Sequence, residues 1–142
     1  MGVCLQSTSY TCGAASIATL LRARGVEAAE PEAARLSHTV PGRGVTDLGA
    51  ALALRAKLPG RRVEIRDVAS PDDLAREPLP CLLPLRYSFW FDHMTVLLRV
   101  DSHGFWLGDP LTGPALLTRE ELSEPCSGGR SSSWISTTAK GR

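Results

Sequence analysis

The chain has 142 residues, with 16 Lys and Arg against 15 Asp and Glu, so its formal net charge is +1. This length suits one domain, and 43% hydrophobic with 22% charged residues is typical of a globular protein rather than a disordered or fibrous one. A charge this close to neutral provides no broad basic field, and no local basic patch stands out, which argues against a nucleic-acid partner. We therefore predict a single domain over residues 1–142.

Signals for membranes, metals and disulfides are weak. The longest uncharged run, residues 1–21, contains too many polar residues for a spanning helix and lacks the basic start of a signal peptide. The four cysteines are too scattered for a disulfide scaffold and form no Cys-x-x-Cys zinc half-site. We expect no membrane segment in this chain, no metal and no cofactor.

The first part of the chain has helical patterns. Apolar residues recur on one helical face within residues 11–24, and Gly25 supplies a stop. A second helix opens at Glu30, followed by proline in its first turn, and a third runs from Asp47 to about Lys57. The helical part is thus predicted at about residues 11–57.

Strand patterns follow. Residues 62–68 alternate in polarity, and apolar runs of strand length cover residues 81–87 and 94–100. After a turn at residues 101–104, residues 105–107 begin the next predicted strand, and residues 134–136 are predicted as an edge strand. One short helix is predicted from Thr118 to Leu122. Helices followed by antiparallel strands predict an α+β fold, in which an N-terminal helical layer packs on a sheet spanning about residues 61–138.

Cys12 stands apart from the other cysteines, at positions 4, 81 and 126. It falls in the first turn of the first predicted helix, where unpaired N–H groups and the helix dipole favour a thiolate. The small residues 13–15 would let a peptide approach the sulfur. A buried, inert thiol is the alternative, and we interpret the other three cysteines that way.

A nucleophilic thiol needs a base, and the chain has three histidines. His38 lies between predicted helices and His103 lies in a turn, so both are interpreted as solvated residues. His93 directly precedes the apolar strand of residues 94–100, where it would be well held and poised to reach a cleft. The alternative for His93 is a histidine that merely ends a strand.

Geometry separates the acids that would orient this base. Asp92 adjoins His93 and therefore points to the other face of a strand, and Asp101 lies roughly 26 Å along it at about 3.3 Å per residue. Asp109 lies on the next strand, which returns toward His93. In the simplest register it is about three residues from the position directly opposite His93, so a bulge or offset is needed. Its alternative role is to cap the turn that begins at Pro110.

Gln6 is the candidate for stabilising the oxyanion. An enzyme that forms a thioester must stabilise an oxyanion, and an amide six positions upstream could fold back over Cys12. A glutamine before a helix is otherwise ordinary polar surface. The four residues together indicate thiol catalysis, in which Cys12 attacks, His93 moves the proton, Asp109 orients the imidazole and Gln6 stabilises the oxyanion with the Cys12 backbone N–H.

Residues 6–16, 93–100 and 108–110 resemble the papain-like cysteine peptidases that process bacteriocin leader peptides. Those domains are often the N-terminal part of peptide-exporting ABC transporters, where they cut after a Gly-Gly pair, and stand-alone relatives occur. The family's motif of Gln, five residues and Cys-Gly is similar to Gln6 and Cys12, its strand histidine to His93, and its Asp-Pro to Asp109. The family often has an acidic residue just before the nucleophile, where this chain has Thr11.

The resemblance implies a papain-like fold and a peptide or protein substrate. It also implies a cytoplasmic location, with the inner face of the membrane, a membrane-anchored form and export left open, and suggests association with an ABC transporter. The predicted function is that of a cysteine endopeptidase. A peptide-binding module that does not cleave, and another thiol-dependent acyl transferase or amidase, are the alternatives. The aromatic run at residues 87–91 is interpreted either as an apolar subsite or as a hairpin anchor.

Overall fold

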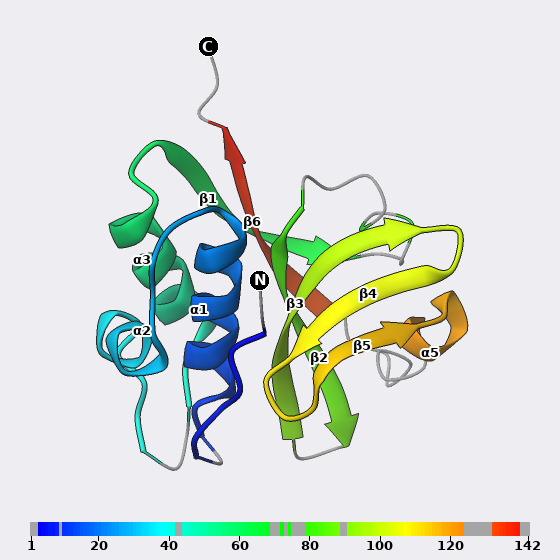
Figure 1. Ribbon diagram of the computed structural model, residues 1–142, viewed down its shortest axis with the longest axis horizontal. Helices are drawn as coiled ribbons and strands as arrows, with labels where there is room; N and C mark the ends of the chain where they lie inside the picture. Colours follow the sequence, from blue (N-terminus) through cyan, green and yellow to red (C-terminus); the bar gives the residue numbers. More distant parts are fainter. Residues whose placement is uncertain are drawn as a thin grey trace.

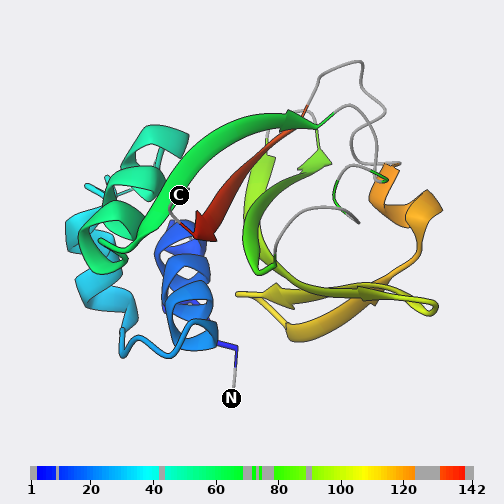
Figure 2. The same cartoon turned by 90° about the horizontal axis from the view of Figure 1, so that it is seen from above.

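The three N-terminal helices gather on one side of the molecule, and a curved sheet with one short helix beside it lies on the other (Figures 1 and 2). The structure is a computed structural model that describes residues 3–8, 10–41, 44–68, 72, 74, 79–88, 91–123 and 132–139. At residues 67–68, 85–88, 91–93, 122–123, 132–134 and 139 the description covers the backbone alone. The predicted aromatic subsite at residues 87–91 therefore lies outside the described side chains.

The described elements follow the predicted order of helices and then strands. The helical side consists of α1 (Cys12–Ala23), α2 (Glu30–Leu36) and α3 (Asp47–Lys57). The sheet consists of β1 (Arg61–Val68), β2 (Cys81–Ser88), β3 (Phe91–Asp101), β4 (Gly104–Asp109), β5 (Gly113–Leu117) and β6 (Ser132–Ala139), with α5 (Arg119–Ser123) beside β5. The α+β architecture, with a helical layer on an antiparallel sheet, is confirmed.

Helix α1 is the centre of the molecule. Every residue from Gly13 to Leu21 is buried, because α2 and α3 cover one side of the helix and β3 lies against another. The sequence predicted only one apolar face. Small residues elsewhere on the helix, among them Ala15 and Ser16, let neighbouring elements approach from all sides.

Local signals explain where the two outer helices begin. Helix α2 has a proline in its first turn, with Glu30 and Glu32 at the positive end of its dipole. Helix α3 is capped by Thr46, whose hydroxyl oxygen accepts a hydrogen bond from the Gly49 N–H at 3.0 Å. No helix in the described part of the chain is long and apolar enough to cross a bilayer.

The six strands are ordered β1-β6-β2-β3-β4-β5, and every neighbouring pair is antiparallel. The prediction that residues 134–136 form an edge strand is wrong, because β6 lies between β1 and β2, where Ile135 pairs with Ile65 and Leu82. Polar neighbours gave this segment the pattern of an edge, although Ile135 is fully buried. Strand β5 was not predicted, because its Gly-Pro start is typical of a turn.

The sheet has a hydrophobic core on each face. Leu82 and Val96 join the core beneath the helices, whereas their chain neighbours Leu83 and Leu97 join a second core with Phe105 and other residues. This alternation follows from the two-residue period of a strand. The first core positions α1 on the sheet, and the second holds the β3–β4 hairpin.

Candidate active site

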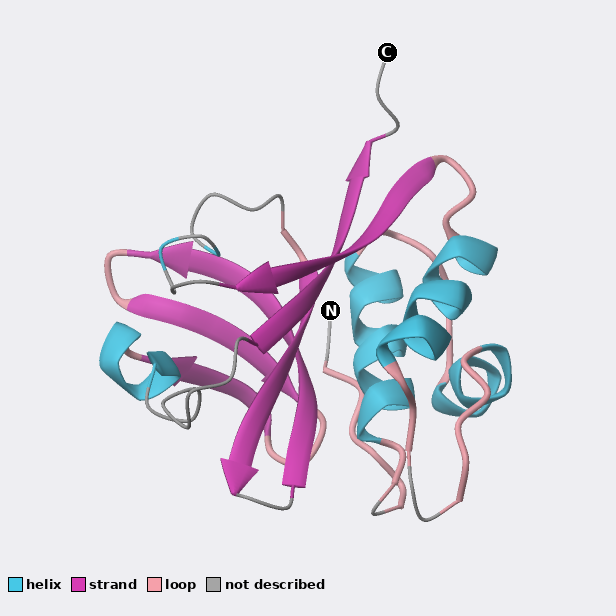
Figure 3. Ribbon diagram, turned by 180° about the vertical axis from the view of Figure 1, so that it is seen from behind, coloured by secondary structure: helices cyan, strands magenta, loops and turns pink. Residues whose placement is uncertain are grey.

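Three elements named in the sequence predictions meet at one end of the interface between helices and sheet. The N-terminus of α1, the beginning of β3 and the turn between β4 and β5 all lie at the lower end of the molecule in Figures 1 and 3. These elements carry Cys12, His93 and Asp109 respectively. The fold therefore brings together three segments that are far apart in the sequence.

Cys12 is the first residue of α1 and is half-buried. The Thr11 carbonyl accepts the hydrogen bond of the Ala15 N–H at 2.9 Å, which marks the start of the helix. N–H groups in this first turn have no acceptor within the helix, and the positive end of the helix dipole lies here. Both effects stabilise a negative charge on the Cys12 sulfur.

The small residues after Cys12 have a role in packing that was not predicted. A Cβ atom on residue 13 would lie 2.0 Å from Cγ1 of Val45, and Ala14 and Ala15 are fully buried. That residues 13–15 also leave room for a peptide beside the Cys12 sulfur stays a prediction. Their size makes room for Val45 and for the protein core.

A hydrogen bond ties α1 to β3 beside His93. The Ser16 hydroxyl donates to the Met94 carbonyl oxygen at 2.9 Å, and the contact is buried. Cys12 lies four residues before Ser16, which is about one helical turn or about 6 Å along the axis. Cys12 is thus one helical turn from the helix end of this hydrogen bond, and His93 is one residue from its strand end.

A bulge in β3 sets the register between His93 and Asp109. The β3–β4 pairing shifts by one residue between Leu97 and Arg99, so that Val96 lies opposite Gly108. Continued by one residue, this register sets Asp109 opposite position 95, two residues from His93. Positions two apart in a strand lie on the same face of the sheet, so positions 93 and 109 belong to the same face. The predicted need for a bulge or offset is confirmed.

Asp109 is buried, with 6% of its surface exposed. Its Oδ1 accepts a hydrogen bond from the Leu111 N–H at 2.8 Å, which closes the turn after β4. The turn-capping role weighed for Asp109 is thus real. This bond uses one lone pair of Oδ1, so the turn-capping role does not by itself prevent the carboxylate from having a further partner.

The N-terminal segment runs between α1 and the β4–β5 turn. The Cys4 N–H donates to Oγ1 of Thr19 on α1 at 2.9 Å, and the Gln6 N–H donates to the Pro110 carbonyl at 2.8 Å. Gln6 therefore lies beside the turn that follows Asp109. This places the fourth predicted site residue at the same end of the molecule as the other three.

The Gln6 side chain is held within the turn that leads to Cys12. Its Nε2 donates to the Thr8 carbonyl at 2.6 Å, and the Thr8 N–H donates to Oγ1 of Thr11 at 3.1 Å. Oε1 of Gln6 is buried and has no hydrogen-bond partner among the described atoms. An amide nitrogen carries two hydrogens, so Nε2 keeps one for another acceptor.

Two contributors to this arrangement were not singled out from the sequence. Glu30, at the start of α2, accepts hydrogen bonds from the Ser7 N–H at 2.7 Å and from the Ser7 hydroxyl, and thereby holds the segment that carries Gln6. Ser16 ties α1 to β3. The spacing of Ser16 one turn after Cys12 was a usable signal, whereas nothing local pointed from Glu30 to Ser7.

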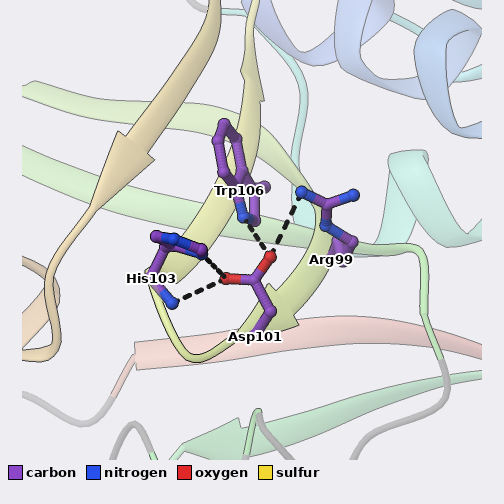
Figure 4. A network of polar contacts seen from close by, with 4 residues as sticks. All are labelled: Arg99, Asp101, His103 and Trp106. Atoms are coloured by element: carbon purple, nitrogen blue, oxygen red, sulfur yellow. Dashed lines mark hydrogen bonds and ion pairs between the residues drawn. The ribbon is translucent and has the colours of Figure 1, made fainter.

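The acid and histidine of the β3–β4 turn form a separate network (Figure 4). Asp101 accepts hydrogen bonds from the His103 N–H and from Nε1 of Trp106, both at 2.8 Å, and pairs with Arg99 at 3.1 Å. Partial desolvation raises the pKa of the Asp101 carboxyl, but these hydrogen bonds and the charges of Arg99 and His103 outweigh it, so the pKa lies below its ordinary value. Asp101 and His103 thus stabilise the hairpin, and His103 is exposed, as predicted for a solvated residue.

Metal-binding and disulfide chemistry find no support in the described residues. No group of three or more His, Cys, Asp or Glu side chains there is arranged to hold a metal ion. Cys4, Cys12 and Cys81 are thiols, and Cys126 lies outside the described residues. The described side chains that these segments bring to this end of the molecule are the Cys12 thiol, the Asp109 carboxylate and the Gln6 amide.

Comparisons with known proteins identify relatives of the whole chain. The family model described as the Peptidase C39 family matches residues 1–129. An uncharacterized protein of Methanothermobacter marburgensis is 36% identical over 122 residues, which cover 84% of this chain and 78% of the relative. All four predicted site residues lie within residues 1–129, which the family model matches.

Solved structures share the fold at low sequence identity. A double glycine motif protease from an AMS/PCAT transporter, solved in complex with the leader peptide, superimposes with a TM-score of 0.79 at 19% identity, over 97% of this chain and 91% of that one. The peptidase domain of Streptococcus ComA, a bifunctional ABC transporter involved in a quorum sensing pathway, gives a TM-score of 0.76 at 19% identity over 98% of both chains. The predicted papain-like fold is thereby confirmed.

Proposed function

Because the chain belongs to the Peptidase C39 family, we propose that it is a cysteine peptidase that cuts a peptide substrate with Cys12 as nucleophile. The observation that carries this proposal is the buried hydrogen bond between Ser16 and Met94, which lies one helical turn from Cys12 and one residue from His93. A thiol at a helix N-terminus beside a histidine is the arrangement that nucleophilic thiol catalysis requires.

In the proposed reaction, His93 accepts the proton of the Cys12 thiol, and the thiolate attacks the carbonyl carbon of the scissile bond. The tetrahedral intermediate collapses to a thioester as His93 returns the proton to the leaving amine. A water molecule, deprotonated by His93, then attacks the thioester and releases the carboxylic acid and the Cys12 thiol. Asp109 orients the imidazole and stabilises its charged form.

The oxyanion of each tetrahedral intermediate needs hydrogen-bond donors. The Cys12 backbone N–H is one, since it belongs to the unpaired group at the start of α1. The second is Nε2 of Gln6, whose other hydrogen is bonded to the Thr8 carbonyl and so keeps the amide oriented. Donors that are oriented before the reaction stabilise the developing charge without reorganisation.

The substrate that we propose is a peptide or leader peptide. One structural neighbour was solved with a leader peptide, and another is a domain of an ABC transporter. We extend the proposal to association with such a transporter at the cytoplasmic face of the membrane. Whether a Gly-Gly pair precedes the cut bond is decided by the cleavage sites themselves.

The test is incubation with a peptide library, with the cut sites identified by mass spectrometry. We expect the wild type to cut peptides and Cys12→Ala and His93→Ala to be inactive. Cys4→Ala is the matched control, because Cys4 is also a half-buried thiol but lies on the N-terminal segment. Peptide cleavage that persists in Cys12→Ala contradicts the proposal.

Labelling of the thiols separates the alternative functions. In a peptidase, iodoacetamide alkylates Cys12 at neutral pH far faster than Cys4 or Cys81, and His93→Ala abolishes the difference. A module that only binds peptides has affinity for them, while its Cys12 reacts no faster than Cys4, the other half-buried thiol. An amidase or acyl transferase keeps the fast Cys12 reaction but yields products other than two cut peptides.

A further inference from the structure

Ser16 forms a hydrogen bond of a different kind from the other buried hydroxyls of the helical layer. Thr19 and Ser37 each donate to the carbonyl four residues earlier in the same helix, at 3.0 and 2.7 Å. This local bond is the ordinary way to satisfy a hydroxyl inside a helix. Ser16 is fully buried as well, yet it donates to Met94, 78 residues away on β3.

The Met94 carbonyl needs this donor because of its neighbours in the sheet. Met94 lies opposite Pro84 of β2, and the pairing of β3 with β4 ends at Val96 and Gly108, before it reaches Met94. In an antiparallel sheet a residue directs its N–H and C=O toward one opposite residue. Proline has no N–H, so Pro84 cannot donate to the Met94 carbonyl. The Ser16 hydroxyl supplies the hydrogen bond that the sheet lacks.

The position of Pro84 is itself unusual. Strand β2 lies between β6 and β3, and proline is ordinarily confined to edge strands, to strand ends or to bulges. A buried carbonyl without a donor destabilises a protein, so a proline in this strand requires compensation. Here the compensating donor comes from the helix that carries Cys12.

We propose that Ser16 is a positioning residue that fixes Cys12 relative to His93. The inference rests on the proposed function, and it concerns what holds the two reacting groups at their separation. One end of the bond belongs to the helix of the nucleophile and the other to the strand of the base. Strand β2 pairs with β3 on both sides of Met94, but Pro84 has no N–H to donate, so the Met94 carbonyl is bonded to α1.

The test compares Ser16→Ala with Ser37→Ala. Both variants lose one buried hydroxyl that is bonded to a carbonyl oxygen, but Ser37 lies at the end of α2 and bonds within its own helix. In Ser16→Ala we expect kcat to fall on the order of 10²-fold, as displacement of reacting groups by about 1 Å can produce, with little change in KM. The pH of half-maximal Cys12 alkylation by iodoacetamide should rise, because His93 no longer stabilises the thiolate. In Ser37→Ala both quantities should match the wild type.

The outcomes distinguish the inference from the function on which it rests. If the wild type neither cuts peptides nor alkylates Cys12 faster than Cys4, both the proposed function and the role of Ser16 are overturned. If the wild type cuts peptides and folded Ser16→Ala has the kcat and alkylation profile of the wild type, only the role of Ser16 is overturned.

A second variant covers the case in which Ser16→Ala does not fold. Ser16→Cys has nearly the same size and a weaker hydrogen-bond donor. We expect a smaller fall in kcat and a shift of the pH profile of kcat in the same direction as for Ser16→Ala. A wild-type pH profile in folded Ser16→Cys overturns the inference.

Discussion

Val45 packs directly over Gly13, with its Cγ1 2.0 Å from where a Cβ atom of residue 13 would lie. The loop before α3 holds Val45 there, because the N–H groups of Val40 and Gly44 each donate to the other residue's carbonyl at 2.9 Å. Gly44 has φ +84°, which favours glycine. Only glycine fits beneath this β-branched side chain, immediately after the candidate nucleophile.

We expect Gly13→Ala to lower the free energy of unfolding by about 1–3 kcal/mol, as overpacking of a core does. Urea unfolding measures the effect. Gly60→Ala is the control, because a Cβ there meets nothing within 4 Å. Adding Val45→Ala to Gly13→Ala should recover part of the loss. If the two substitutions prove additive, the contact between these residues is not its cause.

Two substitutions of Asp109 separate its role in capping the turn from the effect of its negative charge. Asp109→Asn keeps an Oδ1 that accepts from the Leu111 N–H but removes the negative charge, whereas Asp109→Ala removes both. We expect Asp109→Asn to keep near wild-type stability and to lose on the order of 10²–10⁴ in kcat, because a neutral amide does not hold the imidazole in the required form. Peptide hydrolysis and thermal unfolding are measured together. Full activity of Asp109→Asn would reduce Asp109 to a turn residue.

Gln6→Ala and Gln6→Glu test the oxyanion donor. Both variants lose the Nε2 hydrogens, and Gln6→Glu keeps the size of the side chain. We expect kcat to fall on the order of 10²–10³-fold in each, with KM nearly unchanged, because the donor acts on charge that develops in the transition state. Steady-state kinetics with the identified substrate peptide provides the measurement. A rise in KM alone would assign Gln6 to substrate binding.

Glu30 should influence turnover from a distance. In Glu30→Ala the Ser7 N–H and hydroxyl lose their acceptor, which loosens the segment that carries Gln6. We expect a fall in kcat of roughly tenfold, equivalent to about 1.4 kcal/mol of activation free energy. The control is Glu32→Ala on the same helix, which loses its 3.0 Å ion pair with Lys57 instead. Equal kinetics in the two variants would disprove a link between Glu30 and the site.

The Asp101 network should contribute stability in a pH-dependent way. The pKa of this carboxyl is lowered in the folded protein, so its contribution is fully present above the unfolded value of about 3.9 and is lost as the pH falls through the folded value. Asp101→Asn should therefore destabilise the protein at pH 6 and differ less from the wild type below about pH 3. Urea unfolding at both pH values measures this, with the exposed Glu120→Gln as control. A difference independent of pH would exclude the charge as its cause.

Local chemistry explains why most elements could be predicted. Helices α1 and α3 begin and end within one residue of their predicted bounds, because caps, a stop glycine and apolar spacing all act within one element. The bulge in β3 could also be anticipated, since the distance between His93 and Asp109 along the hairpin demanded an offset. The hairpin turn at residues 101–104 followed from its turn residues.

Long-range pairing explains what could not be predicted. The place of β6 depends on β1, about 70 residues earlier, and no local pattern records that pairing. The bonds from Ser16 to Met94 and from Ser7 to Glu30 likewise join distant segments. The segments of the candidate site were therefore recognisable one by one, while the contacts that hold them together required the fold.

The interior place of β6 also constrains the order of folding. Strand β1 has β6 as its strand neighbour in the described sheet, and β6 is synthesised after all the other described elements. During translation β1 and one edge of β2 therefore expose unpaired N–H and C=O groups, which are templates for pairing with other chains. Pairing between segments this distant is also slow. Nascent chains should thus be most prone to aggregation just before β6 emerges from the ribosome.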